Sequence, residues 1–193
     1  MSLNKYRIID LFIYGFILLF MQVVSVIAQY RLTTFFTLSI TIVMLIILTV
    51  RWGLFALIHA AVVGLVYAFL ATQMIDGEKS LLVNACIYGI GNCFIVINVL
   101  LLKLMGAERL YSGGWWLILY ALVGFVSVIV GRSLVGIFFG EQFITSVKNF
   151  ATTESLNFIF AIIILFITNK QENMLKDQKE YFLEVRLGGK NEN

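Results

Sequence analysis

The stretch LLVNACIYGIGNCFIVINVLLL, residues 81–102, is apolar over about 20 residues, the length of helix that crosses the hydrocarbon core of a bilayer. Asn84, Tyr88 and Asn92 interrupt it at intervals of four residues. On a helix, residues four apart share one face. The segment is therefore predicted to be a transmembrane helix with one polar stripe, and the remaining chain must supply the partners of that stripe.

The composition of the whole chain agrees with a membrane protein. Of its 193 residues, 61% are hydrophobic and only 13% are charged, and the mean hydropathy is +0.96. Soluble domains carry about a quarter charged residues, so an excess of apolar side chains on this scale calls for lipid as the solvent. The length suits one domain, and the sequence predicts an all-α membrane protein.

Six apolar segments are predicted to cross the membrane, joined by short connections. A five-span alternative merges the second segment with the first as one hairpin. The membrane bundle is expected to cover residues 1–168. Residues 169–193 form a cytoplasmic tail with an amphipathic helix and a disordered end. That helix could lie on the membrane, dock on a partner, or extend the last span into solvent. The six spans are placed at 9–29, 33–50, 53–73, 81–102, 115–139 and 152–168.

The orientation follows from the excess of Lys and Arg in cytoplasmic loops. With the N-terminus inside, only Arg31, Lys79 and Lys148 fall outside, and Arg132 lies within a span. Both termini are therefore predicted to be cytoplasmic, in a multi-pass protein of the cell membrane. The inner side receives Lys5, Arg7, Arg51, Lys103, Arg109, Lys170, Lys176, Lys179, Arg186 and Lys190.

Polar side chains of three predicted spans fall at the same depth. The stripe of the fourth span runs inward from the outer surface, and Arg132 lies about 26 Å above the inner end of the fifth span at 1.5 Å per residue. Glu154 and Asn157 open the sixth span at its outer end. Because polar groups in hydrocarbon turn towards the bundle interior, these residues predict a pocket open to the outside. The substrate-binding candidates are Asn84, Tyr88, Asn92, Arg132, Glu154 and Asn157.

Two other interpretations of these residues remain open. Arg132 and Glu154 could pair with each other and fix the bundle, and the amides could only join neighbouring helices. Gln22 and Ser25 of the first span could also contribute to the pocket, though weakly.

No catalytic constellation or metal site is apparent in the sequence. His59 has no second ligand at metal spacing, and it is interpreted as a hydrogen-bonded core or interface residue. Cys86 and Cys93 lie within one apolar span and are interpreted as small packing residues. P-loop and dinucleotide-binding glycine patterns are missing, so no enzyme activity, cofactor or nucleic-acid partner is expected.

Small residues recur every four positions along the third predicted span, at Ala56, Ala60, Gly64 and Ala68. Such a stripe allows two helices to approach closely. It is expected to pack within the bundle or against another subunit.

In architecture the whole chain resembles the substrate-binding S components of energy-coupling factor (ECF) vitamin transporters. The local resemblance rests on RWGLFALIHAAVVGLVYAF (51–69), on YGIGN (88–92) and on the tail NKQENMLKDQKEYFLEV (169–185). It implies that the chain binds a vitamin or vitamin precursor from outside and works with a transmembrane coupling subunit and two cytoplasmic ATPases. It further implies that the loop after the first span and GEQFITSVKNF (140–150) cover the pocket. Arg132 would then favour an acidic or carbonyl-rich ligand, and Tyr88 would stack on a ring.

One departure from the family concerns the docking face. Many S components carry an Ala-x-x-x-Ala face on the first helix, whereas LFIYGFILLFMQVVSVIA (11–28) has only Gly15, Ser25 and Ala28 as small residues. Docking would then be borne by Gly15 and the stripe of the third span. The competing hypothesis is a structural multi-spanning subunit of a cell-envelope or cell-shape complex without a small-molecule ligand. A membrane enzyme is the third.

Overall fold

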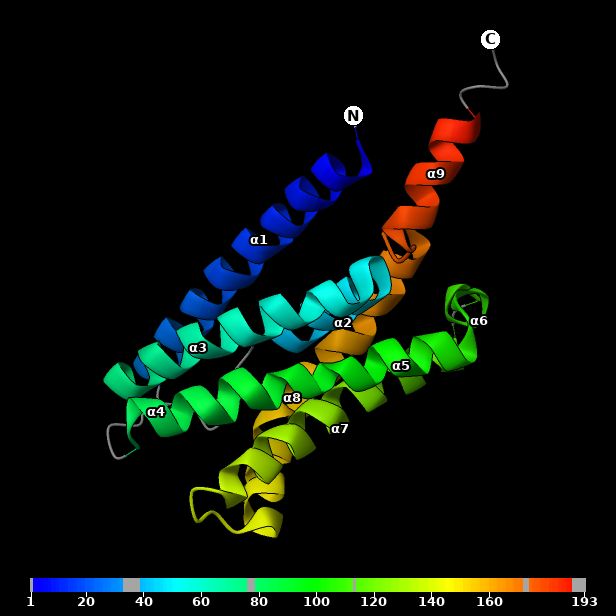
Figure 1. Ribbon diagram of the computed structural model, residues 1–193. Helices are drawn as coiled ribbons and strands as arrows, with labels where there is room; N and C mark the ends of the chain where they lie inside the picture. Colours follow the sequence, from blue (N-terminus) through cyan, green and yellow to red (C-terminus); the bar gives the residue numbers. More distant parts are fainter. Residues whose placement is uncertain (1, 33–38, 76–78, 113, 172–173, 189–193) are drawn as a thin grey trace.

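The computed structural model describes residues 2–32, 39–75, 79–112, 114–171 and 174–188 (Figure 1). This part of the chain is helical and has no strand, which confirms the predicted all-α class. The long helices are α1 (Leu3–Leu32), α3 (Ala56–Met74), α7 (Trp115–Ile137) and α8 (Phe143–Lys170). A fifth long segment, Leu81–Met105, consists of α4 (Leu81–Asn84), the π-helical η2 (Ala85–Ile90), the 3₁₀ turn η3 (Cys93–Ile95) and α5 (Val96–Met105).

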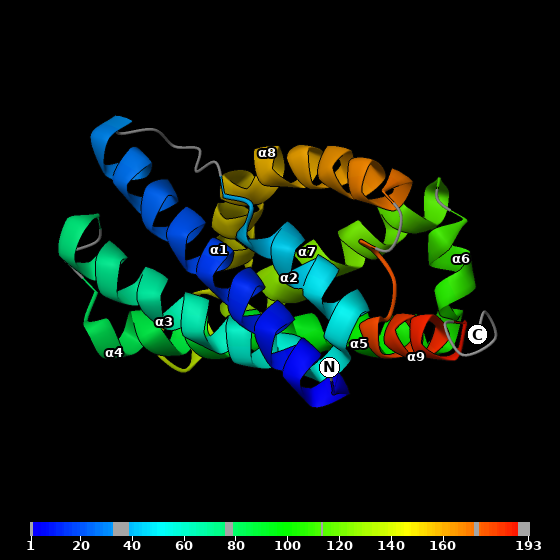
Figure 2. The same cartoon turned by 90° about the horizontal axis from the view of Figure 1, so that it is seen from above.

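Five continuous helical segments of the described residues are long and apolar enough to cross a membrane, and one of them, Thr41–Met74, contains a reversal. It comprises α2 (Thr41–Trp52), the 3₁₀ turn η1 (Gly53–Phe55) and α3. Gly53 takes a left-handed φ of +57°, which a residue without a Cβ adopts readily. The chain turns back there, and α2 and α3 run side by side in opposite directions (Figure 2). The segment therefore contains two antiparallel helices, which brings the helix count of the bundle close to the predicted six, although only five of the described segments have the length and apolarity of a membrane span.

The second pass is shorter than the predicted span 33–50. Residues 33–38 lie outside the described part, and α2 has 12 residues, about 18 Å at 1.5 Å per residue. Nearly all of its side chains are buried, because α2 contacts α1, α3, α5, α7 and α8. It is a central core helix, whereas the long helices around it expose large apolar side chains such as Phe12, Phe69 and Ile163. Such outer faces suit lipid tails and fit a multi-pass membrane protein.

The predicted connection at 140–151 is wrong, because α8 already begins at Phe143. The sequence there is too polar for hydrocarbon, but the backbone hydrogen bonds of a helix do not require an apolar sequence. The sixth pass is thus a 28-residue helix instead of the predicted span 152–168, and its first turns extend beyond the apolar section.

The tail is a separate helix that docks on the bundle. The chain leaves the helical path after Lys170, and α9 (Gln178–Gly188) follows. The Tyr6 hydroxyl donates a 2.7 Å hydrogen bond to Oε1 of Gln178, and the Tyr6 ring stacks on Phe182 at 5.6 Å between centroids. The start of α1 and the helix α9 therefore lie at the same end of the bundle (Figure 1). The tail does not continue the last span into solvent.

A buried polar cluster anchors this end. Arg51 donates to both carboxylate oxygens of Asp10, at 2.7 and 3.1 Å, and to the backbone oxygen of Met174 at 3.0 Å. Trp52 donates to the same carboxylate at 2.5 Å. The cluster joins the start of α1, the end of α2 and the tail. The short helix α6 (Ala107–Tyr111) also holds the tail, since the Tyr111 hydroxyl accepts a hydrogen bond from the backbone N–H of Asp177 at 3.1 Å.

Candidate functional site

At the opposite end of the bundle, polar side chains surround a cavity of about 350 Å³. Its lining includes the exposed residues Lys79 and Asn149, so the cavity reaches the surface at this end. Contributions come from α1, α2, α3, α4, η2, α7 and α8 and from three connections at this end, which join α1 to α2, α3 to α4 and α7 to α8. The lining consists of Gln22, Ser25, Gln29, Ser39, Thr41, Ile42, Tyr67, Ala71, Ile75, Lys79, Asn84, Tyr88, Asn92, Arg132, Glu141, Ser146, Asn149, Phe150, Thr153 and Glu154.

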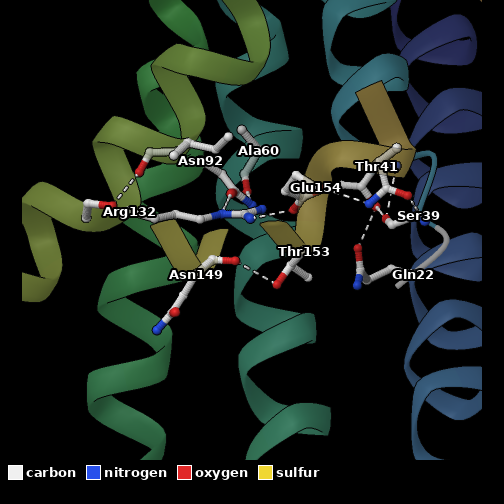
Figure 3. A network of polar contacts seen from close by, with 12 residues as sticks. Gln22, Ser39, Thr41, Ala60, Asn92, Arg132, Asn149, Thr153 and Glu154 are labelled. Atoms are coloured by element: carbon white, nitrogen blue, oxygen red, sulfur yellow. Dashed lines mark hydrogen bonds and ion pairs between the residues drawn. The ribbon is translucent and has the colours of Figure 1, made fainter. Parts of the chain in front are cut away.

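A buried ion pair forms the inner wall (Figure 3). Nη1 of Arg132 on α7 donates to Oε1 of Glu154 on α8 at 2.7 Å, and its Nε donates to Oδ1 of Asn92 at 2.9 Å. The two charged side chains are only 8% and 9% exposed. Removing charges from water is costly unless they pair and keep hydrogen bonds, and this geometry supplies both. One of the two interpretations left open by the sequence, pairing of Arg132 with Glu154, is thus present.

The polar network continues behind Glu154 towards α1. Asn157 donates from Nδ2 to Oε2 of Glu154 at 2.7 Å, and its Oδ1 accepts from the backbone N–H of Ser39 at 2.8 Å. The Ser39 hydroxyl donates to Oγ1 of Thr41, which donates in turn to Oε1 of Gln22 at 2.5 Å (Figure 3). Asn157 does not line the cavity. It holds Glu154 in place and ties α8 to the start of α2.

Three aromatic rings form a second wall. Tyr67 of α3 meets Tyr88 of η2 edge to face at 4.3 Å between centroids, and Phe150 of α8 meets Tyr88 at 6.0 Å. The guanidinium carbon of Arg132 lies 5.1 Å from the Tyr88 ring centre and 5.7 Å from that of Phe150. The attraction of a cation to the ring faces adds to the ion pair in fixing the Arg132 side chain. All three rings stay partly exposed and line the cavity.

Glycines allow the walls to approach closely. A Cβ placed on Gly64 would lie 2.3 Å from the backbone oxygen of Tyr88, and one placed on Gly91 would lie 2.7 Å from the Cα of Arg132. Gly131 meets the backbone oxygen of Gly91 in the same way, at 2.6 Å. Tyr88 itself stands in the π-helical segment η2, a local irregularity that is frequent at functional sites. The sequence offered no signal for this irregularity beyond its glycines.

An ion pair between two connections lies at the mouth. Nζ of Lys79 is 2.7 Å from Oε1 of Glu141, whose Oε2 accepts from the Ser146 hydroxyl at 2.6 Å. Gly140, with φ +84°, lies in the turn that follows α7, directly before Glu141. Burial raises the pKa of Glu141, but the hydrogen bonds from Lys79 and Ser146 and the Lys79 charge outweigh burial, so the pKa lies below its ordinary value.

Five of the six predicted substrate-binding residues line the cavity, and the sixth, Asn157, supports Glu154 from behind. Asn84 donates to Oγ1 of Thr72 at 2.9 Å. Gln22 and Ser25 also line the cavity, and so does Gln29, which sequence reasoning missed. Since these three residues follow the i, i+3, i+7 spacing of one helix face, the signal was present. The predicted covering loop at 140–150 contributes Glu141, Ser146, Asn149 and Phe150, mostly as helix, and residues 33–38 of the other loop are not described.

The predicted docking residues lie elsewhere. The stripe Ala56, Ala60, Gly64 and Ala68 packs inside the bundle, with Ala60 accepting from Asn92 at 3.5 Å. Packing within the bundle was one of the two expected roles. Gly15 lines an apolar groove of about 230 Å³ between α1 and α3, where His59 Nε2 contacts the backbone oxygen of Leu11 at 2.9 Å. His59 is therefore hydrogen-bonded, as expected.

Within the described ranges, no cluster of His, Cys, Asp or Glu side chains is arranged to hold a metal ion. The site offers amides, hydroxyls, aromatic rings and two ion pairs, which is chemistry suited to binding a polar small molecule. Comparisons with protein-family models, with curated proteins and with solved structures find no match to this chain.

Proposed function

We propose that this chain is the substrate-binding subunit of an uptake system for a small water-soluble micronutrient, such as a vitamin or its precursor. The observation that carries the proposal is the polar cavity itself, which gathers side chains from seven helical elements of an otherwise apolar bundle. Its volume of about 350 Å³ falls at the lower end of the range of small-molecule pockets, roughly 300–1,000 Å³.

The distribution of basic residues supports binding from outside the cell. Lys5, Arg7 and Arg51 lie at the end of the bundle that carries both termini, and Lys103, Arg109 and Lys170 belong to helix ends on the same side. The cavity end carries Arg31, Lys79 and Lys148. The positive-inside rule then puts the termini in the cytoplasm, with the cavity facing the opposite side of the cell membrane.

The sequence contains no P-loop, the motif that binds ATP phosphates, which fits a subunit that depends on separate ATPases. In the proposal, a transmembrane coupling subunit and two cytoplasmic ATPases provide the energy for uptake, as the resemblance to ECF S components implies. The tail and the start of α1 form the surface nearest to such cytoplasmic partners.

A structural role in an envelope or cell-shape complex is the second candidate. It is favoured by the closed network of Asn92, Arg132, Glu154 and Asn157, in which the buried charges satisfy one another without a ligand. In that case the cavity would hold only water, and the network would serve to join the segment Leu81–Met105 to α7 and α8.

The test is the thermal stability of the detergent-purified protein against a panel of vitamins and precursors. A ligand at a hundred times its dissociation constant should stabilise the protein by about 2.7 kcal/mol. Gln29→Leu should weaken binding at least tenfold, because Gln29 lines the cavity and its Oε1 has no partner among the described residues. Phe138→Ala, at an 86% exposed position that is not part of the cavity lining, is the control and should leave affinity unchanged. Lack of any shift, with no ATPase or coupling subunit co-purifying, would favour the structural role.

A further inference from the structure

We infer that the cavity selects an uncharged planar heterocycle whose edge carries an N–H beside a C=O, as in a lactam or cyclic imide. The inference rests on the proposed function and narrows its ligand. It is carried by three properties of the lining: its charges cancel, it keeps one amide oxygen and one guanidinium nitrogen without a partner among the described residues, and it presents flat aromatic surfaces.

The charges of the lining cancel pair by pair. Among the described residues, the Lys, Arg, Asp and Glu side chains that line the cavity are Lys79, Arg132, Glu141 and Glu154. Each cation lies 2.7 Å from one of the anions. A ligand with net charge would have to separate a pair or remain uncompensated, and leaving a buried charge without its partner is strongly unfavourable. Of the two ligand types that the resemblance implied for Arg132, acidic or carbonyl-rich, the paired charges therefore favour a ligand carbonyl over a carboxylate.

Two polar groups of the lining, one acceptor and one donor, have no hydrogen-bond partner among the described residues. Oε1 of Gln29 is buried and has no hydrogen-bond partner in the described part of the chain. Arg132 uses Nε and Nη1, whereas no described residue accepts from its Nη2. A buried acceptor without a partner is costly, so Gln29 calls for a ligand N–H. The guanidinium can donate to a C=O. The amide of Gln29 itself carries an acceptor oxygen beside an NH2 donor, which is the complement of a ligand edge with an N–H beside a C=O.

The aromatic wall accounts for the planar shape. Tyr67, Tyr88 and Phe150 surround one side of the cavity and remain partly exposed towards it. Aromatic rings favour offset-stacked or edge-to-face contacts with another flat ring. A sugar or an aliphatic amino acid would use the amides but would leave these surfaces without a complementary face.

The inference is tested with probes that share one ring. Uracil carries the proposed edge without charge, orotate adds a carboxylate to the same ring, and 1,3-dimethyluracil loses both N–H donors. Hypoxanthine extends the edge to a bicyclic ring. Binding is measured by calorimetry on protein in detergent, beside the vitamin panel with added aliphatic carboxylates, amino acids and sugars.

Uracil or hypoxanthine should bind, and both orotate and 1,3-dimethyluracil should bind at least tenfold more weakly than uracil. Gln29→Leu should remove the preference for uracil over 1,3-dimethyluracil, whereas Phe138→Ala should keep it. Orotate binding as tightly as uracil would overturn the inference and leave the proposed function intact. Tight binding of an aliphatic or sugar probe with no heterocycle bound would do the same. If no probe of any class binds, the inference and the proposed function fail together.

Discussion

Gly91 and Arg132 are in direct contact through their backbones: a Cβ on Gly91 would lie 2.7 Å from the Cα of Arg132 and 2.8 Å from its backbone nitrogen. The contact brings the segment after η2 against α7 at the depth of the ion pair. Because backbone atoms cannot turn aside as a side chain can, the position of Arg132 depends on the absence of a side chain at residue 91.

Gly91→Ala should therefore destabilise the bundle. Overpacking costs about 1–3 kcal/mol, against a gain of about 0.5–1 kcal/mol from replacing a helical glycine, so a net loss of about 1 kcal/mol is expected. Gly89→Ala is the matched control, since its Cβ would first meet the flexible side chain of Leu65, at 3.3 Å, and the nearest backbone atom of another helix, the oxygen of Ala61, only at 3.9 Å. Thermal unfolding in detergent compares the two variants. Equal stabilities of the two variants would show that the segment at Gly91 can move away from α7 without a loss of free energy of unfolding.

The buried ion pair should show strong coupling. Arg132→Met leaves the Glu154 carboxylate buried with Asn157 alone, and Glu154→Gln leaves the guanidinium without its counter-charge. Each single substitution should cost about 3 kcal/mol. The double variant should cost less than the sum of the two, because no uncompensated charge remains.

A double-mutant cycle on the free energy of unfolding measures this coupling, with an expected interaction of about 1–3 kcal/mol. Strictly additive effects of the two substitutions would mean that water in the cavity already screens the pair.

The sequence predicted the helical segments approximately, and it predicted that the polar residues of different segments meet in one place. Both follow from the cost of exposing polar groups to hydrocarbon, which turns Asn92, Arg132 and Glu154 towards one interior. Topology alone then gives these residues a common depth.

The details that depend on tertiary contacts were not predictable in this way. The π-helical turn at Tyr88 reflects the approach of Gly64 to its backbone, a contact between residues 24 positions apart. The early start of α8 was missed because the predicted spans were bounded by apolarity, whereas a helix can continue into a polar region. The Lys79–Glu141 pair joins two connections 62 residues apart, a distance over which local patterns carry no information.

The ion pair at the mouth should make a small contribution to stability that depends on pH. The pKa of Glu141 is lower in the folded protein than in the unfolded chain, because the bonds from Lys79 and Ser146 outweigh the effect of burial. Its contribution is complete above the unfolded pKa, about 4.3, and is lost as the pH falls through the folded value. Since the Lys79 side chain is 43% exposed, no more than about 1 kcal/mol is expected.

The measurement compares the wild type with Glu141→Gln between pH 7 and pH 3. The difference in melting temperature should be present at pH 7 and should vanish towards pH 3. A difference that grows on acidification would have the wrong sign for a carboxylate with a lowered pKa.

Because the tail packs on the bundle, substitutions of two of its leucines, Leu175 and Leu183, should lower the free energy of unfolding by different amounts. Leu175 is 3% exposed and packs in the hydrophobic core, whereas Leu183 of α9 is 43% exposed. Leu175→Ala should cost about 2–3 kcal/mol, as for other buried leucines, and Leu183→Ala no more than about 0.5 kcal/mol, as at surface positions. Thermal unfolding measures the loss, and limited proteolysis should cut the Leu175→Ala tail first, because the tail then loses its buried apolar anchor and keeps the hydrogen bonds from Arg51 and Tyr6 and the ring contact of Tyr6 with Phe182. Equal and small effects of both substitutions would mean that the tail leaves the bundle in solution, and that its contacts with Tyr6 and Arg51 contribute little to the fold.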